Sequence, residues 1–594
     1  MTGLASFAAR ATELLAARTV ANKDAWGDLK RQVARELGVP PPSDAELAEA
    51  LDPATRERLK PVWRTKPVRS RSGVAIVAVM SSPASCPHGK CSFCPGGPEV
   101  GVPQSYTGFE PSTMRAIEFA YDPYRIVRTR LAQLERNGHS VEKVDIVIQG
   151  GTFPARDVAY QEWFVAGITA GLNDGPGDGS WPTESVWANL DANERALRLA
   201  ELQSQNETAR CRLVGLTIET KPDWCLEPHI DLMLRLGATR VEIGIQTLDE
   251  GVLEATHRGH TLQESRRSLQ VARDAGFKVC AHLMPGLPRP ARLVTDFSDS
   301  ADSNGSQSEK SAQSATKKGA LDPDPAADIE DGRRLFAEPE WRPDMLKIYP
   351  TLVVQEGETL LKRQWQRGEF HPYDTAQAAS VIARIKTHVP EWCRIQRVDR
   401  DIPTTHVEAG VLNSNLRQFT HAEMARLGLP PCRCVRCRES GSREAVGMEV
   451  DAERAVLVRR TYEAAGGTEL FLSFEDPDSD AILGFLRLRR VGVLAHRPET
   501  RVPGGAAFVR ELKVFGTARA LADDPEGDTS LPAAGSFQHQ GFGSRLLAEA
   551  ETVAHEWGVG RLLVIAGPGV KPYYRARGYS DCGPYVAKVP NGHA

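Results

Sequence analysis

With 594 residues, 41% of them hydrophobic and 25% charged, the chain is typical of a soluble globular protein with two or more folded domains. We expect a cytoplasmic location, because no apolar run approaches the roughly 18 residues of a membrane span and no secretory leader is recognisable. The net charge of −4 excludes the chain as a whole from being a polyanion binder, so local basic patches have to be sought.

The first 70 residues are predicted to form a helical region. Apolar residues recur at helical spacing through Leu29, Val33 and Leu37. A basic stretch from Arg56 to Arg71 follows. As a solvated helix face it would be inert, whereas as a contact with nucleic acid it would add affinity that falls with salt.

Residues 71–395 alternate between short apolar β-rich runs and helical patterns. The runs are GVAIVAVM, VDIVIQGG, RLVGLTIET, RVEIGIQT, KVCAHLMPG and MLKIYPT, with helical segments such as HIDLMLRLGA between most of them. This alternation indicates an α/β fold with a parallel sheet and outer helices, and about six such units would make a partial (βα)6 barrel. The stretch 296–330, rich in Ser, Asp, Ala and Lys, is expected to be a disordered insertion.

The character of the sequence changes after residue 446. The runs ELFLSFED, ILGFLRLRR, FVRELKVFG and RLLVIAG predict strands of a smaller α/β domain over 446–594. A linker over 396–445 joins it to the barrel.

Six of the 11 cysteines fall into two tight clusters, which in a cytosolic enzyme favours metal over disulfides. Cys86, Cys91 and Cys94 follow the first strand, where α/β barrels bind ligands. Three thiolates can hold three irons of a cubane cluster and leave the fourth iron open for S-adenosylmethionine. Structural zinc, with His88 as fourth ligand, is the alternative.

The second strand ends in Gly150-Gly151-Thr152, where a backbone without side chains can approach a ligand. With Phe93 inside the cysteine loop, this glycine pair resembles the radical S-adenosylmethionine superfamily. We therefore expect Gly150, Gly151 and Thr152 to contact S-adenosylmethionine.

The segment QHQGFGS, from Gln538 to Ser544, predicts a glycine turn that opens a helix. The N–H groups and positive dipole end of such a helix suit a pyrophosphate. The turn follows a strand and precedes a strand and a helix carrying Tyr573 and Tyr574, an order that resembles the GCN5-related acetyltransferase fold. Adjacent tyrosines on a helix point to different faces, so at most one can face a thioester.

Ten motifs in order resemble the Elongator catalytic subunit family, the tRNA uridine 5-carboxymethyl synthases. They are CPHGKCSFCPGG, QSYTGFEPSTMRAI, GGTF, IETKPDWC, EIGIQT, LKIYPTLV, NSNLRQ, ELKVFG, QHQGFG and YYRARGY, and they extend over roughly residues 60–594. The resemblance implies a 4Fe-4S cluster, S-adenosylmethionine, acetyl-CoA and zinc. It also implies a tRNA substrate, an electron donor for the cluster, and a homodimer or Elongator-like subunits as partners.

The resemblance assigns roles to particular residues. It implies that Cys86, Cys91 and Cys94 hold the cluster, and that Cys432, Cys434 and Cys437 bind zinc with His421 or Cys393 as a candidate fourth ligand. The expected catalytic residues are Lys347, Tyr349 and Tyr574. Expected acetyl-CoA contacts are Lys143, Glu511, Leu512, Lys513, Val514, Gln538, Gly541, Phe542, Gly543, Ser544, Tyr573 and Tyr574. The basic residues expected to contact tRNA are Lys60, Arg64, Lys66 and Arg69.

Some positions depart from the family pattern. Lys513 stands where histidine is expected, Lys221 and Trp224 where arginine and tyrosine are commoner, and Thr405-His406 replaces a more apolar pair. These changes affect local geometry rather than the reaction.

The implied reaction removes hydrogen from the methyl group of acetyl-CoA, joins that carbon to C5 of the wobble uridine, and hydrolyses the thioester to leave 5-carboxymethyluridine. One alternative is a protein lysine acetyltransferase with a structural iron–sulfur domain. Another is an iron–sulfur scaffold that only binds tRNA, against which the intact glycine turn and Gly150-Gly151-Thr152 argue.

Overall fold

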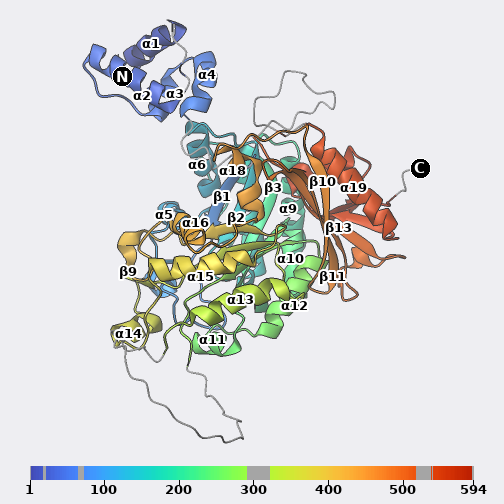
Figure 1. Cartoon of the computed structure of the whole chain (residues 1–594). Helices are drawn as coiled ribbons and strands as arrows, with labels where there is room; N and C mark the ends of the chain where they lie inside the picture. Colours follow the sequence, from blue (N-terminus) through green and yellow to red (C-terminus); the bar gives the residue numbers. More distant parts are fainter. Residues whose placement is uncertain are drawn as a thin grey trace, which may run out of the picture.

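The computed structural model describes residues 2–17, 20, 22–63, 73–290, 321–516, 537 and 540–590. Its first helices, α1 (Thr2–Ala17), α2 (Lys23–Leu37), α3 (Asp44–Ala50) and α4 (Pro53–Trp63), form a bundle with its own small core around Phe7, Trp26 and Leu29. Figure 1 shows this bundle set apart from the rest of the chain. In the described part of the chain, every helix is too short or too polar to span a bilayer.

The predicted parallel sheet is present. It contains β1 (Ala75–Met80), β2 (Lys143–Gln149), β3 (Arg212–Thr220), β4 (Arg240–Gln246), β5 (Lys278–Leu283), β6 (Met345–Ile348) and β8 (Arg394–Val398), in chain order. Every neighbouring pair is parallel. The first six strands coincide with the six predicted runs, whereas β8 is a seventh strand that crosses the expected boundary at residue 395.

Helices cover the outer face of this half-barrel (Figure 1). They include α6 (Pro123–Arg136), α7 (Val158–Asp174), α10 (Glu227–Arg235), α12 (Leu262–Asp274), α13 (Pro325–Ala337) and α15 (Thr375–Thr387). Apolar strand residues such as Ile146 and Ile218 share one core with helix residues such as Phe164 and Leu269. The alternate residues of each strand therefore face the concave interior.

The expectation that residues 296–330 form a disordered insertion is wrong for its last six residues. Residues 325–330 form the first turns of α13, which begins at Pro325 and is capped by Asp324. Asp328 is buried and accepts hydrogen bonds from Arg289, Gly286 N–H and Tyr373. These contacts tie the start of α13 to the barrel, while residues 296–320 lie outside the described part of the chain.

A second sheet follows, in the order β10-β11-β12-β13-β14-β16-β15. Its strands are β10 (Val456–Ala464), β11 (Gly467–Asp476), β12 (Ala481–Arg490), β13 (Ala506–Val514), β14 (Arg561–Val564), β15 (Ser580–Cys582) and β16 (Tyr585–Lys588). Helix α19 (Phe542–Glu556) covers one face and shares a core with Leu472 and Val509. The other face packs on the barrel, because Phe508 and Tyr585 belong to the barrel core.

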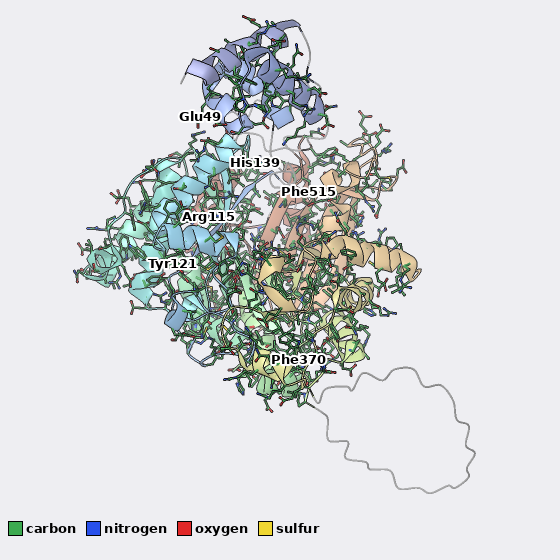
Figure 2. The ribbon with its side chains drawn as sticks, turned by 90° about the vertical axis from the view of Figure 1, so that its left-hand side faces the viewer. Glu49, Arg115, Tyr121, His139, Phe370 and Phe515 are labelled. Carbon is green, nitrogen blue, oxygen red and sulfur yellow. The ribbon has the colours of Figure 1, made fainter. Side chains whose placement is uncertain are left out.

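The two sheets meet at a buried junction that contains both apolar contacts and ion pairs. Phe515, labelled in Figure 2, follows β13, and its ring centroid lies 5.9 Å from the guanidinium carbon of Arg394 on β8. Across this junction Arg273 pairs with Glu469, and Asp344 pairs with Arg510. All four side chains are at most 1% exposed. The barrel and the second sheet are therefore held as one body.

Candidate active site

The cysteine loop lies directly after β1, as predicted. Cys86 is half-buried, whereas Cys91 and Cys94 are buried. The backbone N–H of Cys86 donates to Gln104 Oε1 at 2.5 Å, the N–H of Ser105 donates to Cys94 Sγ at 3.0 Å, and Arg258 Nη1 donates to Cys91 Sγ at 3.7 Å. The last two of these hydrogen bonds end on sulfur, and such donors stabilise a thiolate or a cluster-bound sulfur.

A cavity opens beside this loop at the carboxyl ends of the strands. Its wall includes Cys86, Phe93, Gly151 and Thr152, together with the strand-end residues Gln149, Glu219, Glu242, Gln246, His282, Tyr349 and Arg397. The structure therefore brings the predicted glycine pair and Tyr349 to the cysteine loop. Lys221, which departs from the family pattern, also lines this cavity.

The backbone torsions of both residues suit glycine, and at Gly150 space requires it as well. Gly150 has φ +117°, and a Cβ there would lie 2.4 Å from Ser81 Oγ. Gly151 has φ +64°, and a Cβ there would lie 3.7 Å from Cys86 Sγ, inside the space beside the thiol. Both torsions suit glycine, so the pair keeps the backbone open toward the cavity.

The donor set fits a cluster with an open position. Zinc ligands at about 2.3 Å from one ion lie roughly 3.8 Å apart. In the described residues, two groups of three have ligand atoms that all lie within 4.8 Å of one another, and the loop cysteines belong to neither. The cavity also contains buried amide oxygens without partners, Gln149 Oε1 and Gln246 Oε1, as expected where a polar ligand completes a site.

The concave face below the cavity carries charged residues in register. Glu219 on β3 is opposite Glu242 on β4, Glu242 is opposite Cys280 on β5, and His282 is opposite Lys347 on β6. Because residues two apart on a strand share a face, Glu219, Glu242, His282 and Lys347 converge on one point.

Lys347, expected to be catalytic, lies in an ion pair with Glu242 and another, at 3.3 Å, with Glu219. Burial alone would lower the pKa of Lys347, but the neighbouring carboxylates raise it well above its usual range. The ammonium is therefore a fixed positive charge beneath the cavity, whereas Tyr349 lies in the cavity wall.

Sequence reasoning missed Glu219, Glu242 and His282. Each lies within a predicted strand, between two residues that face the other side of the sheet: Glu219 in IET, Glu242 in VEI and His282 in AHL. A parallel sheet covered on both faces reads as continuously apolar. The charged alternate positions were therefore the available signal that this interior is polar.

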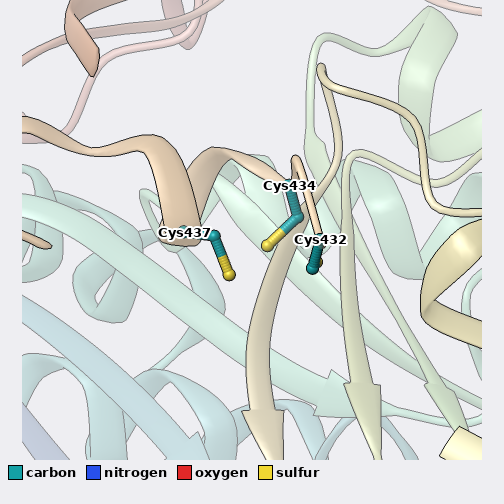
Figure 3. A group of neighbouring side chains, drawn as sticks. All are labelled: Cys432, Cys434 and Cys437. Atoms are coloured by element: carbon teal, nitrogen blue, oxygen red, sulfur yellow. The ribbon is translucent and has the colours of Figure 1, made fainter. Parts of the chain in front are cut away.

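The second cysteine group is compact, as Figure 3 shows. The sulfur atoms of Cys432, Cys434 and Cys437 all lie within 4.8 Å of one another, a spacing that suits a single ion such as zinc. Cys434 caps helix α17 (Val435–Arg438). Neither His421 nor Cys393, the predicted fourth ligands, belongs to this group.

The glycine turn of the second sheet is present at Gly541, which has φ +80° and caps α19. Gln538 lies outside the described residues. A Cβ on Gly543 would lie 3.4 Å from Tyr573 Oη, so that hydroxyl is beside the turn. Ser544 Oγ accepts from Arg577 Nη2 at 3.3 Å. The start of α19 is thus framed by a tyrosine hydroxyl and a guanidinium.

Tyr573 and Tyr574 point to different faces, as predicted. Tyr574 is 7% exposed and packs in the core around α19, with its ring 5.8 Å from that of Tyr579. Tyr573 is only partly buried at the edge of that core, with the guanidinium carbon of Arg577 3.7 Å from its ring centroid. Tyr573 is therefore the tyrosine nearer the glycine turn.

Strands β13 and β14 diverge beside this turn. They pair only from Ala506 to Val509, and the pairing of β13 with β12 shifts at Arg510. Arg510 and Glu511 consequently both face the barrel, as does Lys513, whereas Leu512 and Val514 pack toward α19. The stretch 511–514 thus continues beyond the part of β13 that pairs with β14.

Lys143 begins β2 and is in register with Arg212, against which the loop at Gly569 packs. It therefore lies beside the second sheet, at the opposite end of β2 from the cavity residue Gln149. The two positions are six residues apart along the strand, which is roughly 20 Å.

The tRNA-binding candidates are largely outside the structure. Arg64, Lys66 and Arg69 lie outside the described residues, as does the side chain of Lys60.

The radical SAM superfamily model matches residues 80–290, and the Radical_SAM C-terminal domain model matches residues 343–426. The half-barrel with its cysteine loop thus defines a radical S-adenosylmethionine protein, a class that uses a 4Fe-4S cluster and S-adenosylmethionine.

Relatives that align with most of this chain show which family of radical S-adenosylmethionine proteins it belongs to. The tRNA uridine(34) acetyltransferase of Methanocaldococcus infernus is 41% identical over 558 residues, which are 93% of this chain and 92% of the relative. Elongator complex protein 3 of Homo sapiens is 38% identical, over 92% of this chain and 90% of the relative. The solved archaeal Methanocaldococcus infernus Elp3 with an N-terminal deletion aligns at TM-score 0.67 and 36% identity, over 87% of this chain and 99% of that structure. The chain belongs to the Elongator complex protein 3 family.

Proposed function

We propose that this chain modifies the wobble uridine of tRNA to 5-carboxymethyluridine, using S-adenosylmethionine and acetyl-CoA. The observation that carries the proposal is that one rigid body holds two sites of different chemistry. A cysteine-lined cavity lies at one end of the barrel, and a glycine turn beside diverging strands lies near the other. The names of the archaeal relatives, tRNA uridine(34) acetyltransferase, support the substrate.

Cys86, Cys91 and Cys94 would hold the cluster, and S-adenosylmethionine would lie against Gly150, Gly151 and Thr152. When bound, this pair supplies a radical that can remove hydrogen from a methyl group. The protein's own contribution is position and shelter from water. Lys347 holds a positive charge below the cavity, and Tyr349 offers a hydroxyl in its wall.

The second sheet would be a GCN5-related acetyltransferase domain over 446–594. Acetyl-CoA would place its pyrophosphate at Gly541, Phe542, Gly543 and Ser544, and its pantetheine arm along 511–514. Gln538, Tyr573 and Tyr574 would complete this site, and Lys143 would contact the same cofactor from the barrel. The acetyl group then has to cover the height of the barrel, roughly 20 Å, to reach the cavity.

The remaining assignments complete the proposal. The domains would be a tRNA-binding region over 1–70, a radical S-adenosylmethionine domain from 71 to the end of β8 at residue 398, and a zinc-binding linker from there to 445 with Cys432, Cys434 and Cys437. The protein would act in the cytoplasm with an electron donor, as a homodimer or with Elongator-like subunits.

Isotope labelling tests the reaction. Acetyl-CoA deuterated in its methyl group is incubated with tRNA, S-adenosylmethionine and the anaerobically reconstituted protein. We expect deuterium in 5′-deoxyadenosine and a two-carbon acid on C5 of uridine, because the methyl C–H bond has to break. Ordinary acyl transfer leaves all three hydrogens in place. Unlabelled 5′-deoxyadenosine together with fully deuterated acetyl groups on lysine would instead identify a protein acetyltransferase.

A further inference from the structure

A histidine in the cavity wall lies against a buried carboxylate. His282 on β5 places Nε2 3.1 Å from Glu242 Oε2, and the two side chains are 12% and 1% exposed. The ring of Tyr349 meets the ring of His282 edge to face at 5.4 Å between centroids. The imidazole is therefore held between a carboxylate behind it and the cavity in front.

The state of Glu242 fixes which nitrogen of His282 carries the proton. Burial opposes ionisation of Glu242, but the charge of Lys347 and the hydrogen bond from His282 outweigh it and hold the pKa of the carboxyl well below its usual range. An ionised carboxylate can only accept hydrogen bonds, so His282 Nε2 has to donate. In the neutral ring Nδ1 is then an unprotonated base.

Other cavity groups are less suited to take a proton. Among the described residues, each carboxylate of the cavity wall already accepts a hydrogen bond or an ion pair. Glu110 accepts from Thr107, Glu219 from Tyr106, Asp401 from Arg397 and Glu242 from Lys347. His282 combines a fixed orientation with a nitrogen that the proton on Nε2 leaves free.

A bound metal ion is the competing explanation, because Glu242, Cys280 and His282 offer ligand atoms that all lie within 4.8 Å of one another. The ammonium of Lys347 is already paired with Glu242 at this point. A second cation there would face that positive charge in a buried setting, where repulsion is strong.

We propose that His282, oriented by Glu242, is the general base that hydrolyses the CoA thioester of the modified uridine. This inference rests on the proposed function. Once the acetyl methyl carbon is bonded to C5, the carbonyl carbon is attached to it and lies in the same cavity. As His282 Nδ1 removes a proton from water, the water oxygen bonds to the carbonyl carbon and the C–S bond breaks. The imidazolium returns its proton to the departing sulfur, and the carboxylic acid ionises to solvent.

The test is a single turnover of the full-length reconstituted protein with tRNA, S-adenosylmethionine and acetyl-CoA. In His282→Gln we expect 5′-deoxyadenosine and the C5 adduct to form as in the wild type, while hydrolysis slows on the order of a hundredfold. The CoA thioester of the modified uridine then accumulates, and mass spectrometry after mild nuclease digestion detects it.

The matched control is His496→Gln. His496 also forms a hydrogen bond with a carboxylate, that of Asp231 at 2.8 Å, but it does not line the cavity. It should give free acid at the wild-type rate.

A second measurement determines which nitrogen of His282 carries the proton in the protein without cofactors. The ¹⁵N resonances that disappear in His282→Gln should show the proton on Nε2, and Glu242→Gln should remove that preference. In the single turnover with cofactors, the adduct of Glu242→Gln should hydrolyse more slowly than that of the wild type.

Three results would overturn the inference. One is free acid from His282→Gln at the wild-type rate without thioester, and another is loss of 5′-deoxyadenosine in that variant alone, since His282 would then act before hydrolysis. If the wild type itself forms neither 5′-deoxyadenosine nor a C5 adduct, the proposed function fails and the inference fails with it.

Discussion

Asp344 and Arg510 form a bidentate ion pair between the two sheets. Arg510 Nη1 and Nη2 lie 2.7 and 2.6 Å from the carboxylate oxygens of Asp344, and both side chains are fully buried. Asp344 precedes β6 of the barrel, whereas Arg510 lies at the irregular step of β13. The irregular step in the pairing of β13 with β12 therefore directs Arg510 into the barrel, beside Glu511.

Breaking this pair should weaken the whole junction. Asp344→Ala leaves buried guanidinium groups without their carboxylate, and we expect a loss of about 3–5 kcal/mol in the free energy of unfolding. Urea denaturation followed by fluorescence and circular dichroism measures it. Glu330→Ala, which removes the exposed partner of Arg333, is the control and should change the midpoint little. Equal midpoints for the two variants would show that the junction does not depend on Asp344.

The cysteine loop predicts an iron content. The anaerobically purified protein should be brown and contain about four irons of a cluster per chain. The triple variant of Cys86, Cys91 and Cys94 to alanine should lose this colour and iron, yet keep any zinc at Cys432, Cys434 and Cys437. Metal analysis of both proteins decides the point. Iron retained by the triple variant would refute the assignment.

The basic N-terminal segment predicts salt-dependent tRNA affinity. Reversing Lys60, Arg64, Lys66 and Arg69 to glutamate should weaken binding and flatten the plot of log affinity against log salt, since each lost phosphate contact removes roughly 0.9 from the slope on duplex nucleic acid. As a control, Arg426→Glu reverses an exposed charge that pairs with Glu423 on its own helix. Fluorescence anisotropy over a salt series gives both slopes, and identical slopes would exclude this segment.

We expect the protein to tolerate removal of residues 296–320. The N–H of Arg289 donates to the carbonyl of Leu321 at 3.2 Å, so the described ends of the chain are adjacent. Replacing 296–320 by a short Gly/Ser bridge should leave cofactor binding intact, because a change in loop length costs only about 0.6 kcal/mol per doubling.

Extending the same excision to residue 330 removes Asp328 and its bonds to Arg289 and Tyr373. That variant should unfold at lower temperature. Similar melting temperatures for both deletions would show that the start of α13 is dispensable.

The features that a few consecutive residues specify could be predicted from the sequence. Six parallel strands, the cysteine loop and the glycine turn all follow from runs of a few residues. β8 was missed because its sequence, RIQRV, places Arg394 and Arg397 toward a polar interior and contains no apolar run. The pair of Glu242 and His282 depends on register between strands, which the sequence of either strand alone does not contain.

The position of the second sheet was beyond sequence reasoning for a similar reason. Lys143 and Lys513 were predicted as contacts of one cofactor from motifs far apart in the chain. Lys143 begins β2, but the placement of Lys513 near that end of the barrel depends on buried ion pairs such as Asp344 with Arg510, which join residues 166 positions apart.

Lys513 makes stability depend on pH. Burial, with the nearby charge of Arg394, lowers its pKa to about 8 from an ordinary value of 10.5. Between these values the unfolded chain binds more protons than the folded one, so stability rises as pH increases from about 8 to 10.5. Below pH 8 the free energy of unfolding is reduced by the full cost of burying the ammonium.

Lys513→Met should therefore stabilise the protein at pH 7, on the order of 2 kcal/mol, and much less at pH 10. Urea midpoints at both pH values measure this difference, with the exposed Lys23→Met as control. A gain from Lys513→Met that is equal at the two pH values would show that its ammonium is not the source of the cost.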